Sequence, residues 1–346
     1  MLRPRFLAIC VLGLLLVLVS SPARAQYQLI NLDSNQVKQA THPADPLLVN
    51  GWGLARGTTT PWWVADNESG WATIYNGNGL KLGLEVEIPP TPSGGPIGQP
   101  TGIVWNPSQS NEFQVQGWQT FFIFATLDGT ISAWAPGLAK FDAEIVVDNS
   151  ANKASYTGLA VTNKPSDNFL FAADTANNRV DIYDGTFTWK GSFAADSAIP
   201  SGFTVFGIRD INGQVFVAFA DASGGPGGFV DVYSESGVLL KSSFIHGAPL
   251  NQPWGFAIAP TNFGPLSNTL LISNNTNSGT IHGFNPLNGA FVGTMKDTQG
   301  NVIRIDQLWG IDFGGGVTAN GPRNTLFFAA GPSDNLAGTF GKIILK

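Results

Sequence analysis

The chain is organised around the stretch Gln252-Pro253-Trp254-Gly255-Phe256-Ala257-Ile258, in which a large aromatic residue precedes a glycine inside a short apolar run. Two further apolar runs follow at 269–273 and 279–284, separated from it and from each other by a loop and an asparagine-rich turn. Short apolar runs bounded by turn residues are typical of β-strands. The stretch therefore predicts three consecutive strands, and a fourth run at 290–295 completes the unit.

The same unit recurs along the chain, and the glycine of its first strand marks each recurrence. That glycine follows an aromatic residue or a threonine, and successive glycines are 49, 56, 49, 48 and 55 residues apart. A regular period of this length with about four strands per repeat is typical of a β-propeller. Helical solenoids would need stretches with a period of about 3.6 residues, and the sequence has none. The six positions are Gly53, Gly102, Gly158, Gly207, Gly255 and Gly310.

We predict an all-β fold, a six-bladed β-propeller with four-stranded blades in a single domain over residues 26–346. The last repeat lacks a fourth strand, whereas the strand-like segment 27–33 belongs to no repeat near it. If 27–33 pairs as the outer strand of the last blade, the ring closes and an exposed sheet edge is covered. The predicted blades are approximately 49–90, 98–150, 154–200, 203–247, 251–300, and 303–346 plus 27–33.

Residues 1–25 have the composition of a signal peptide rather than of a folded element. Arg3 and Arg5 precede an apolar run over 6–19, and Ala23-Arg24-Ala25 fits a small-x-small cleavage site. We expect cleavage after Ala25 and secretion to the periplasm or the extracellular space. An uncleaved N-terminal anchor is the alternative. The single cysteine of the sequence lies inside this segment, so we expect the mature chain to contain no disulfide.

The charge balance argues against several classes of partner. After residue 25 the chain has 15 basic residues (18 minus 3) and 24 acidic residues, a net charge of −9, and no cluster of lysine or arginine in the sequence. Nucleic acids and anionic membrane surfaces are recognised by basic patches, so we expect neither as a partner. We also expect a monomer, with no membrane span in the mature chain. A small molecule, a glycan or a protein remains as the partner.

Two resemblances extend this interpretation. The phrase Ala173–Tyr183, a strand, an Asp-containing turn and a second strand, resembles the repeat of NHL-type propellers. Nearly the whole mature chain is also similar to an uncharacterised family of secreted bacterial propeller-like proteins, through phrases such as 127–132, 228–233, 259–264 and 308–310. The resemblance implies a propeller fold and export, and it implies no reaction. Some members of that family end in a PEP-CTERM sorting tail. We expect no such tail here, because the sequence ends on a strand.

Familiar catalytic motifs do not occur in this sequence. It contains neither a G-x-S-x-G nucleophile elbow nor an H-E-x-x-H zinc motif. The three histidines, His42, His246 and His282, are not spaced as metal ligands would be. Whether the chain is an enzyme is therefore open at this point, and its catalytic residues and metal ligands are unknown.

Polar residues gather where the predicted repeats begin. An uncharged polar residue stands two positions before each opening aromatic residue or threonine, and Asp or Asn follows most second strands. If strand direction alternates within a blade, both sets lie on one face of the propeller. We take the following residues as candidates for ligand binding: Asn50, Asp66, Asn67, Gln99, Asp128, Ser155, Asp174, Thr204, Asp221, Gln252, Asn274 and Gln307.

Two interpretations of this face stay open. Asn, Asp and Ser also cap turns by bonding neighbouring backbone amides, and each residue can be explained in that way. Alternatively, the set forms a ligand or cation site at the channel mouth, and its oxygen atoms would suit Ca²⁺, the candidate cofactor. The same choice applies to Trp52, Trp254 and Trp309, which we expect to be packing residues rather than an exposed platform.

We therefore expect a secreted propeller that acts as a binding or scaffold module for a ligand of unknown identity. The alternative is a metal (Ca²⁺)-dependent hydrolase or lyase of the lactonase-like propeller type, proposed only by analogy of fold. A structural extracellular protein without a ligand is a third hypothesis.

Overall fold

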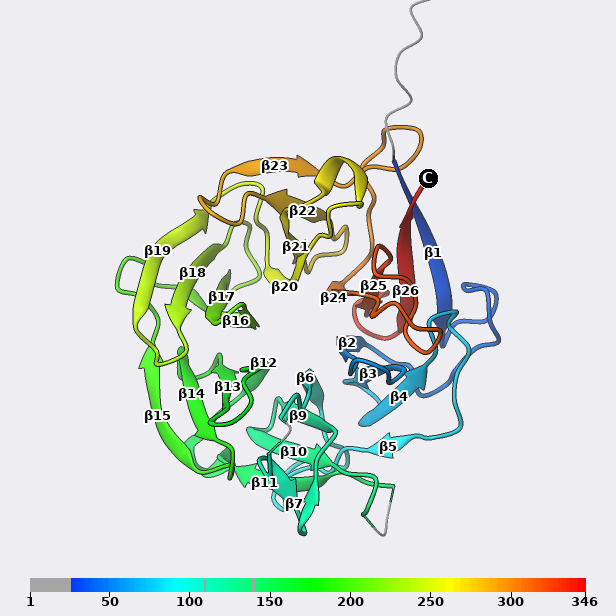
Figure 1. Ribbon diagram of the computed structural model, residues 1–346. Coiled ribbons are helices and arrows are strands. Elements are labelled where there is room, and N and C mark those ends of the chain that lie inside the picture. Colours follow the sequence, from blue (N-terminus) through cyan, green and yellow to red (C-terminus); the bar gives the residue numbers. More distant parts are fainter. Residues whose placement is uncertain (1–25, 109, 139–140) are drawn as a thin grey trace, which may run out of the picture.

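The computed structural model describes residues 26–108, 110–138 and 141–346. They contain six four-stranded sheets arranged in a ring, and this arrangement is the predicted six-bladed β-propeller (Figure 1). The first strand of each blade lies nearest the centre of the ring, and the fourth lies at the periphery. The predicted signal peptide falls on residues 1–25, outside the described residues. No helix of the described residues is long and apolar enough to cross a membrane.

Each blade is an antiparallel meander, with the inner strand given first in each of the following lists. Blade one consists of β2 (Gly51–Ala55), β3 (Trp62–Asp66), β4 (Trp71–Tyr75) and β5 (Val86–Glu87). Blade two consists of β6 (Pro100–Trp105), β9 (Phe122–Thr126), β10 (Thr130–Trp134) and β11 (Glu144–Asp148). Blade three consists of β12 (Tyr156–Val161), β13 (Phe169–Asp174), β14 (Arg179–Asp184) and β15 (Trp189–Ala194).

The second half of the ring follows the same plan. Blade four consists of β16 (Phe203–Ile211), β17 (Gln214–Asp221), β18 (Phe229–Ser234) and β19 (Leu239–His246). Blade five consists of β20 (Pro253–Ile258), β21 (Leu270–Asn274), β22 (Ile281–Phe284) and β23 (Phe291–Thr294). Blade six consists of β24 (Leu308–Phe313), β25 (Leu326–Ala330), β26 (Thr339–Leu345) and, as its outer strand, β1 (Tyr27–Ser34).

Two local features differ from the prediction. The fourth strand of blade one is shorter than the expected 84–88, and Leu84 packs against the hydrophobic core between blades one and two. A small hairpin, β7 (Gln114–Val115) with β8 (Trp118–Gln119), is inserted between β6 and β9. Two single turns of 3₁₀ helix, η1 (Ser150–Asn152) and η2 (Gly264–Leu266), lie in connecting loops.

The N-terminal strand closes the ring, as predicted. β1 pairs antiparallel with β26 from Tyr27 opposite Leu345 to Ser34 opposite Thr339, with a bulge between Asn31 and Asp33. The buried Tyr27 also connects this strand to blade five, because its hydroxyl donates to the carbonyl of Phe263 at 2.6 Å. The edge of β26 is thereby covered.

The repeat glycines bring neighbouring inner strands into contact around the axis. A Cβ added to Gly207 would lie 2.0 Å from the carbonyl oxygen of Trp254, the equivalent point of the next blade. One added to Gly310 would lie 3.0 Å from the carbonyl oxygen of Trp52, so the contacts continue from the last blade to the first. A side chain at these positions would push adjacent blades apart, which explains why glycine recurs there.

Candidate functional site

The two faces of the propeller differ at the axis. We call the face where the six inner strands begin the proximal face, and the face where they end the distal face. Near the proximal face three tryptophans from blades one, five and six fill the centre of the ring: Trp52, Trp254 and Trp309. Trp52 and Trp309 stack with ring centroids 3.7 Å apart, and Trp254 meets both edge-on. All three are buried, so the prediction that they are packing residues is confirmed.

A cavity of about 220 Å³ lies on the axis beyond these tryptophans, and all six inner strands line it. Trp254 forms part of its floor. Each blade also contributes the apolar residue that stands two positions after the opening aromatic residue or threonine, and we call these six the apolar ring. They are buried at the surface of the cavity and retain only a few per cent exposure. The apolar ring consists of Leu54, Ile103, Leu159, Ile208, Phe256 and Ile311.

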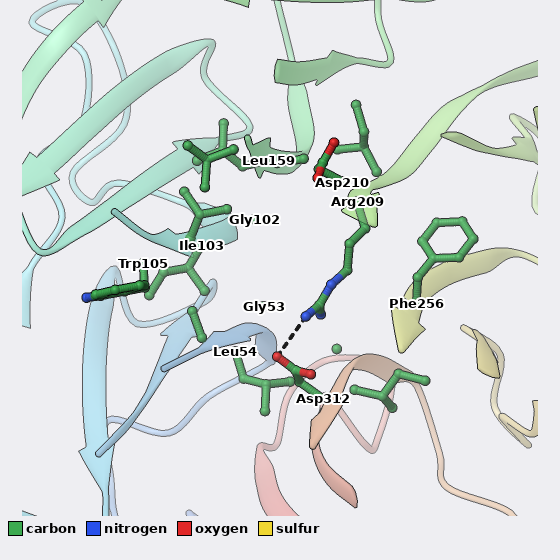
Figure 2. A pocket seen from close by; sticks show the side chains of 18 of the residues that line it. Gly53, Leu54, Gly102, Ile103, Trp105, Leu159, Arg209, Asp210, Phe256 and Asp312 are labelled. Carbon is green, nitrogen blue, oxygen red and sulfur yellow. Dashed lines mark hydrogen bonds and ion pairs between the residues drawn. The ribbon is translucent and has the colours of Figure 1, made fainter. Parts of the chain in front are cut away.

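Charged side chains surround the distal mouth of this cavity. Arg209 on β16 reaches across toward β24, and its Nη2 lies 2.8 Å from Oδ2 of Asp312 (Figure 2). The other carboxylate oxygen of Asp312 accepts the backbone N–H of Phe313 at 2.7 Å. The ion pair thus joins blades four and six at the mouth. The wider bowl outside it measures about 840 Å³.

Arg56, at the end of the inner strand of blade one, faces the same mouth. Its Nε donates to the carbonyl of Phe313 at 2.7 Å, and its guanidinium lies 5.6 Å from the centre of the Trp62 ring. Burial lowers the pKa of Arg56, with Arg209 and Arg323 adding repulsion and Asp312 opposing it. The guanidinium remains charged, because arginine does not lose its proton in proteins. It therefore contributes a partly desolvated positive charge.

The opposite side of the mouth carries a second charged group. The carboxyl of Asp210 is desolvated and lies near Glu235, and burial, as the larger cause, raises its pKa to about 6. One of its oxygens, Oδ2, is buried without a hydrogen-bond partner among the described residues. Lys164 lies 3.0 Å from Glu235. We call Arg56, Lys164, Arg209, Asp210, Glu235, Asp312 and Arg323 together the charged rim.

None of the twelve residues predicted for ligand binding lines this cavity or its bowl. Five of them, Asn50, Asp66, Asn67, Asp174 and Asn274, are buried, and the other seven are partly buried. The structure therefore places the predicted set around the proximal face, as expected. It does not bring their side chains together at an open channel mouth, because the tryptophans occupy the axis there.

Most of these residues form hydrogen bonds within the turns that hold the blades. Asp66 accepts from the hydroxyl of Thr73 at 2.7 Å, and desolvation raises its pKa well above the ordinary range. Asp174 accepts from the backbone N–H of Ser155 at 3.1 Å. The side chain of Gln252 donates to the carbonyls of Asp221 and Gly225 at 3.1 and 2.8 Å. These contacts are those of turn supports.

The remaining members of the predicted set have similar surroundings. Asn50 joins Trp309 to Asn67, and Asn67 donates to the carbonyl of Pro100. Asp128 accepts from the N–H of Thr91 at 2.8 Å. Four more side chains of the set form hydrogen bonds with nearby residues: Thr204 with Thr175, Asp221 with Ser223, Asn274 with Asn251, and Gln307 with Asn277. The backbone carbonyl of Gln99 accepts a hydrogen bond from the N–H of Leu127.

Backbone conformation supplies a second reason for amides at three of the repeat starts. Asn50, Gln252 and Gln307 have φ values of 52°, 52° and 47°, in the left-handed region. They are the residues two positions before the three tryptophans. Asparagine tolerates this conformation better than most residues, and apolar β-branched residues do not. The conformation thus accounts for asparagine at position 50, and at Gln252 and Gln307 it disfavours β-branched residues.

Within the described residues, no group of three or more His, Cys, Asp or Glu side chains is arranged to hold a metal ion. His282 lies between the hydroxyls of Thr280 and Thr294 at 2.8 and 2.9 Å, and burial lowers its pKa to about 4. It is a satisfied core histidine. The Ca²⁺ hypothesis thus gains no set of ligands from this part of the chain.

Sequence reasoning did not select Arg56, Arg209 or Asp312. Arg209 and Asp312 are 103 residues apart, so no local motif contains both. A usable signal was nevertheless present. Each of the three is a charged residue near the end of an inner strand, and the strands of Arg56 and Asp312 otherwise consist of apolar residues and glycine. Charge at that position marks a strand end that faces solvent at the axis.

Comparison with known proteins supports the fold and leaves the ligand open. No family model matches the chain. The chain is similar to uncharacterized protein R640 of Acanthamoeba polyphaga mimivirus, with 30% identity over 260 residues, covering 70% of this chain and 47% of that protein. It is also similar to uncharacterized protein R648 of the same virus, with 26% identity over 336 residues, covering 90% and 78% of the two chains. The chain spans about half the length of R640.

Among solved structures, the propeller resembles a catalytically inactive virginiamycin B lyase from Staphylococcus aureus with quinupristin. The TM-score is 0.52 at 13% identity, covering 93% of this chain and 100% of that one. At this identity the likeness concerns the fold alone. The two relatives above are viral, and neither printed name gives an activity. This chain thus shares a β-propeller fold with enzymes of the lyase type, and its activity must be argued from its own site.

Proposed function

We propose that this protein is an exported, NHL-like β-propeller that binds a small molecule in its axial cavity. The observation that carries the proposal is the form of the cavity, which has an aromatic floor, one apolar residue from every blade around it, and charged groups at its open end. Ligand sites in proteins are concave and mostly apolar, with a few polar groups that fix orientation. The axial cavity is concave and carries charged groups at one end, and its lining exposes polar surface beside the six apolar side chains.

The chemistry of the mouth favours recognition over catalysis. Arginine keeps its proton at physiological pH, so Arg56 and Arg209 would bind and orient a ligand rather than transfer protons. Arg209 and Asp312 already form an ion pair across the mouth, and this pair narrows access to the cavity. A hydrolase or lyase would need a proton donor or acceptor aimed at the substrate. Burial raises the pKa of the Asp210 carboxyl at the rim to about 6.

Export is the second part of the proposal, and it rests on residues 1–25. Their arginine-flanked apolar run and Ala-x-Ala site are typical of a secretory signal. The resemblance to secreted bacterial propellers supports the same location. In the periplasm or outside the cell, a cavity protein of this kind would capture or carry its ligand.

The proposal is tested by obstructing the cavity. Val161 lines both the cavity and the bowl at the edge of the core between blades two and three, so Val161→Trp should narrow the mouth, and circular dichroism checks that the variant keeps its fold. Val292, half exposed on the outer strand of blade five, provides the matched control Val292→Trp. A set of small aromatic fragments is screened against both variants and the wild type by saturation-transfer NMR. We expect fragments that bind the wild type and Val292→Trp and lose binding to Val161→Trp. Equal binding to all three proteins would contradict the proposal.

A further inference from the structure

We infer that the cavity takes a small organic anion, a carboxylate attached to a compact apolar body, with the carboxylate held by Arg209 and Arg56. This inference rests on the proposed function and adds the chemical class of the ligand. The apolar body would occupy the space inside the apolar ring, and the anionic group would lie at the charged rim.

The arginines of the rim have more N–H donors than the protein uses. Each guanidinium carries five donors. Among the described residues, Arg209 makes one hydrogen bond, from Nη2 to Asp312, and Arg56 makes two, to backbone carbonyls. Arg323 makes none within the same residues. A carboxylate can accept two parallel bonds from one guanidinium, which is the strongest pairing open to these donors.

The distribution of charge supports the same class of ligand. Only five arginines follow residue 25, and three of them, Arg56, Arg209 and Arg323, face this mouth. With Lys164 they give the rim four positive charges against three from Asp210, Glu235 and Asp312. The rim is therefore net positive by one, in a chain whose formal net charge is −6. Focused positive potential in a cleft draws anions toward it.

Asp312 shows how such an anion would be held. Its carboxylate occupies one guanidinium edge of Arg209 and makes a 2.8 Å contact there. The facing groups from the neighbouring elements are Arg56, directly after β2, and Arg323 from the loop after β24. A ligand carboxylate would compete with Asp312 for Arg209 or use the free edge of the same group. Asp312 therefore acts as an internal competitor of the ligand.

The floor and walls of the cavity determine the rest of the ligand. The six side chains of the apolar ring offer no hydrogen-bond partner, whereas the lining of the cavity as a whole exposes more polar than apolar surface. A compact hydrocarbon or aromatic part of the ligand therefore gains by leaving water where it covers the apolar ring. A ligand that combines such a body with one carboxylate matches both ends of the cavity.

The test uses three probes with the same aromatic body: naphthoate, naphthylmethanol and naphthylmethylamine. Binding to the purified mature protein is measured by titration calorimetry at neutral pH and low salt. We expect naphthoate to bind about tenfold or more tightly than the alcohol, because the charged pairing is stronger than a neutral hydrogen bond. The amine should bind most weakly.

Variants give changes of opposite sign. Arg209→Gln removes the charge at the mouth and should weaken naphthoate binding about tenfold, with a smaller effect on naphthylmethanol. Asp312→Asn removes the internal competitor while keeping a similar shape, and should strengthen naphthoate binding. Arg304→Gln makes the same charge change at an exposed site outside the rim and should change neither affinity.

The outcomes separate this inference from the proposed function. If the alcohol binds as well as naphthoate and Val161→Trp abolishes both, the cavity is a ligand site and the anionic class is wrong. Preferred binding of the amine would overturn the inference in the same way, as would a loss of naphthoate affinity in Asp312→Asn with its fold intact by circular dichroism. If no probe binds the wild type, both the inference and the proposed function lose their support.

Discussion

Replacing a repeat glycine by alanine should weaken the propeller according to how close the next blade lies. At Gly207 the added Cβ would lie 2.0 Å from the carbonyl oxygen and 2.7 Å from the carbonyl carbon of Trp254. Both are backbone atoms that cannot rotate away, so blades four and five must separate. Overpacking of a core costs about 1–3 kcal/mol, and this contact belongs at the upper end, about 3 kcal/mol.

Gly158 provides the matched control, because it occupies the same position of another blade. Its added Cβ would lie 3.1 Å from the nearest atom, so a small adjustment suffices. Neither glycine has a positive φ, and strain of the backbone therefore does not enter. Alanine also loses less conformational entropy on folding than glycine, by about 0.4–1 kcal/mol. We expect the free energy of unfolding of Gly158→Ala to lie within about 1 kcal/mol of that of the wild type.

The assay is urea unfolding followed by tryptophan fluorescence, to which the axial Trp52, Trp254 and Trp309 contribute among the ten tryptophans of the sequence. A loss of about 3 kcal/mol in Gly207→Ala corresponds to a decrease in Tm of about 4–5 °C for a domain of this length. If the two variants lose the same stability, or Gly158→Ala loses more, then the glycines do not set the distance between blades and this reasoning is refuted.

Three further predictions concern the edge strand, the N-terminus and a buried carboxyl. Deleting residues 27–34 exposes the edge of β26 and should cause aggregation or a large loss of stability. Deleting residues 36–41 in the following loop should have little effect. If the two deletion variants melt at the same temperature, pairing of β1 with β26 does not stabilise the ring. Secreted protein should begin at Gln26 by mass spectrometry, and retention of residues 1–25 would contradict export with cleavage. Burial raises the pKa of Asp231 to about 6, so the stability it contributes is full below the unfolded value, about pH 4, and falls as pH rises through 6. The free energy of unfolding, measured by urea titration at several pH values, should therefore decline as pH rises, and Asp231→Asn should reduce this decline by about 2 kcal/mol. If the variant shows the same decline as the wild type, Asp231 is not its cause.

The fold could be predicted from the sequence because its determinants are local and repeated. The glycine spacing predicted the number of blades, since most inner strands approach the backbone of the next blade closely at this position. The closing strand at 27–33 could be assigned because the last repeat was one strand short. The short β5 and the β7–β8 hairpin could not, because their extent depends on how Leu84 and the loop residues pack against neighbouring blades.

The candidate site was harder to predict, for a physical reason. The proximal turns carry Asp, Asn and Gln at regular positions, and such a pattern is visible in a sequence whether its cause is binding or turn geometry. The hydrogen bonds of Asp174 and Gln252 are those that turn geometry requires. The distal mouth depends on Arg209 and Asp312 meeting across the axis, and only the closed ring brings them together.

The position of the ligand is tested most directly by a crystal of the mature protein soaked with naphthoate. The proposal predicts difference density inside the apolar ring, with the carboxylate within hydrogen-bond distance of Arg209 or Arg56. Density for naphthoate at the proximal face, next to Gln252 or Asp66, would contradict it. Naphthoate bound on the outer strands, with no naphthoate density in the axial cavity, would contradict it as well.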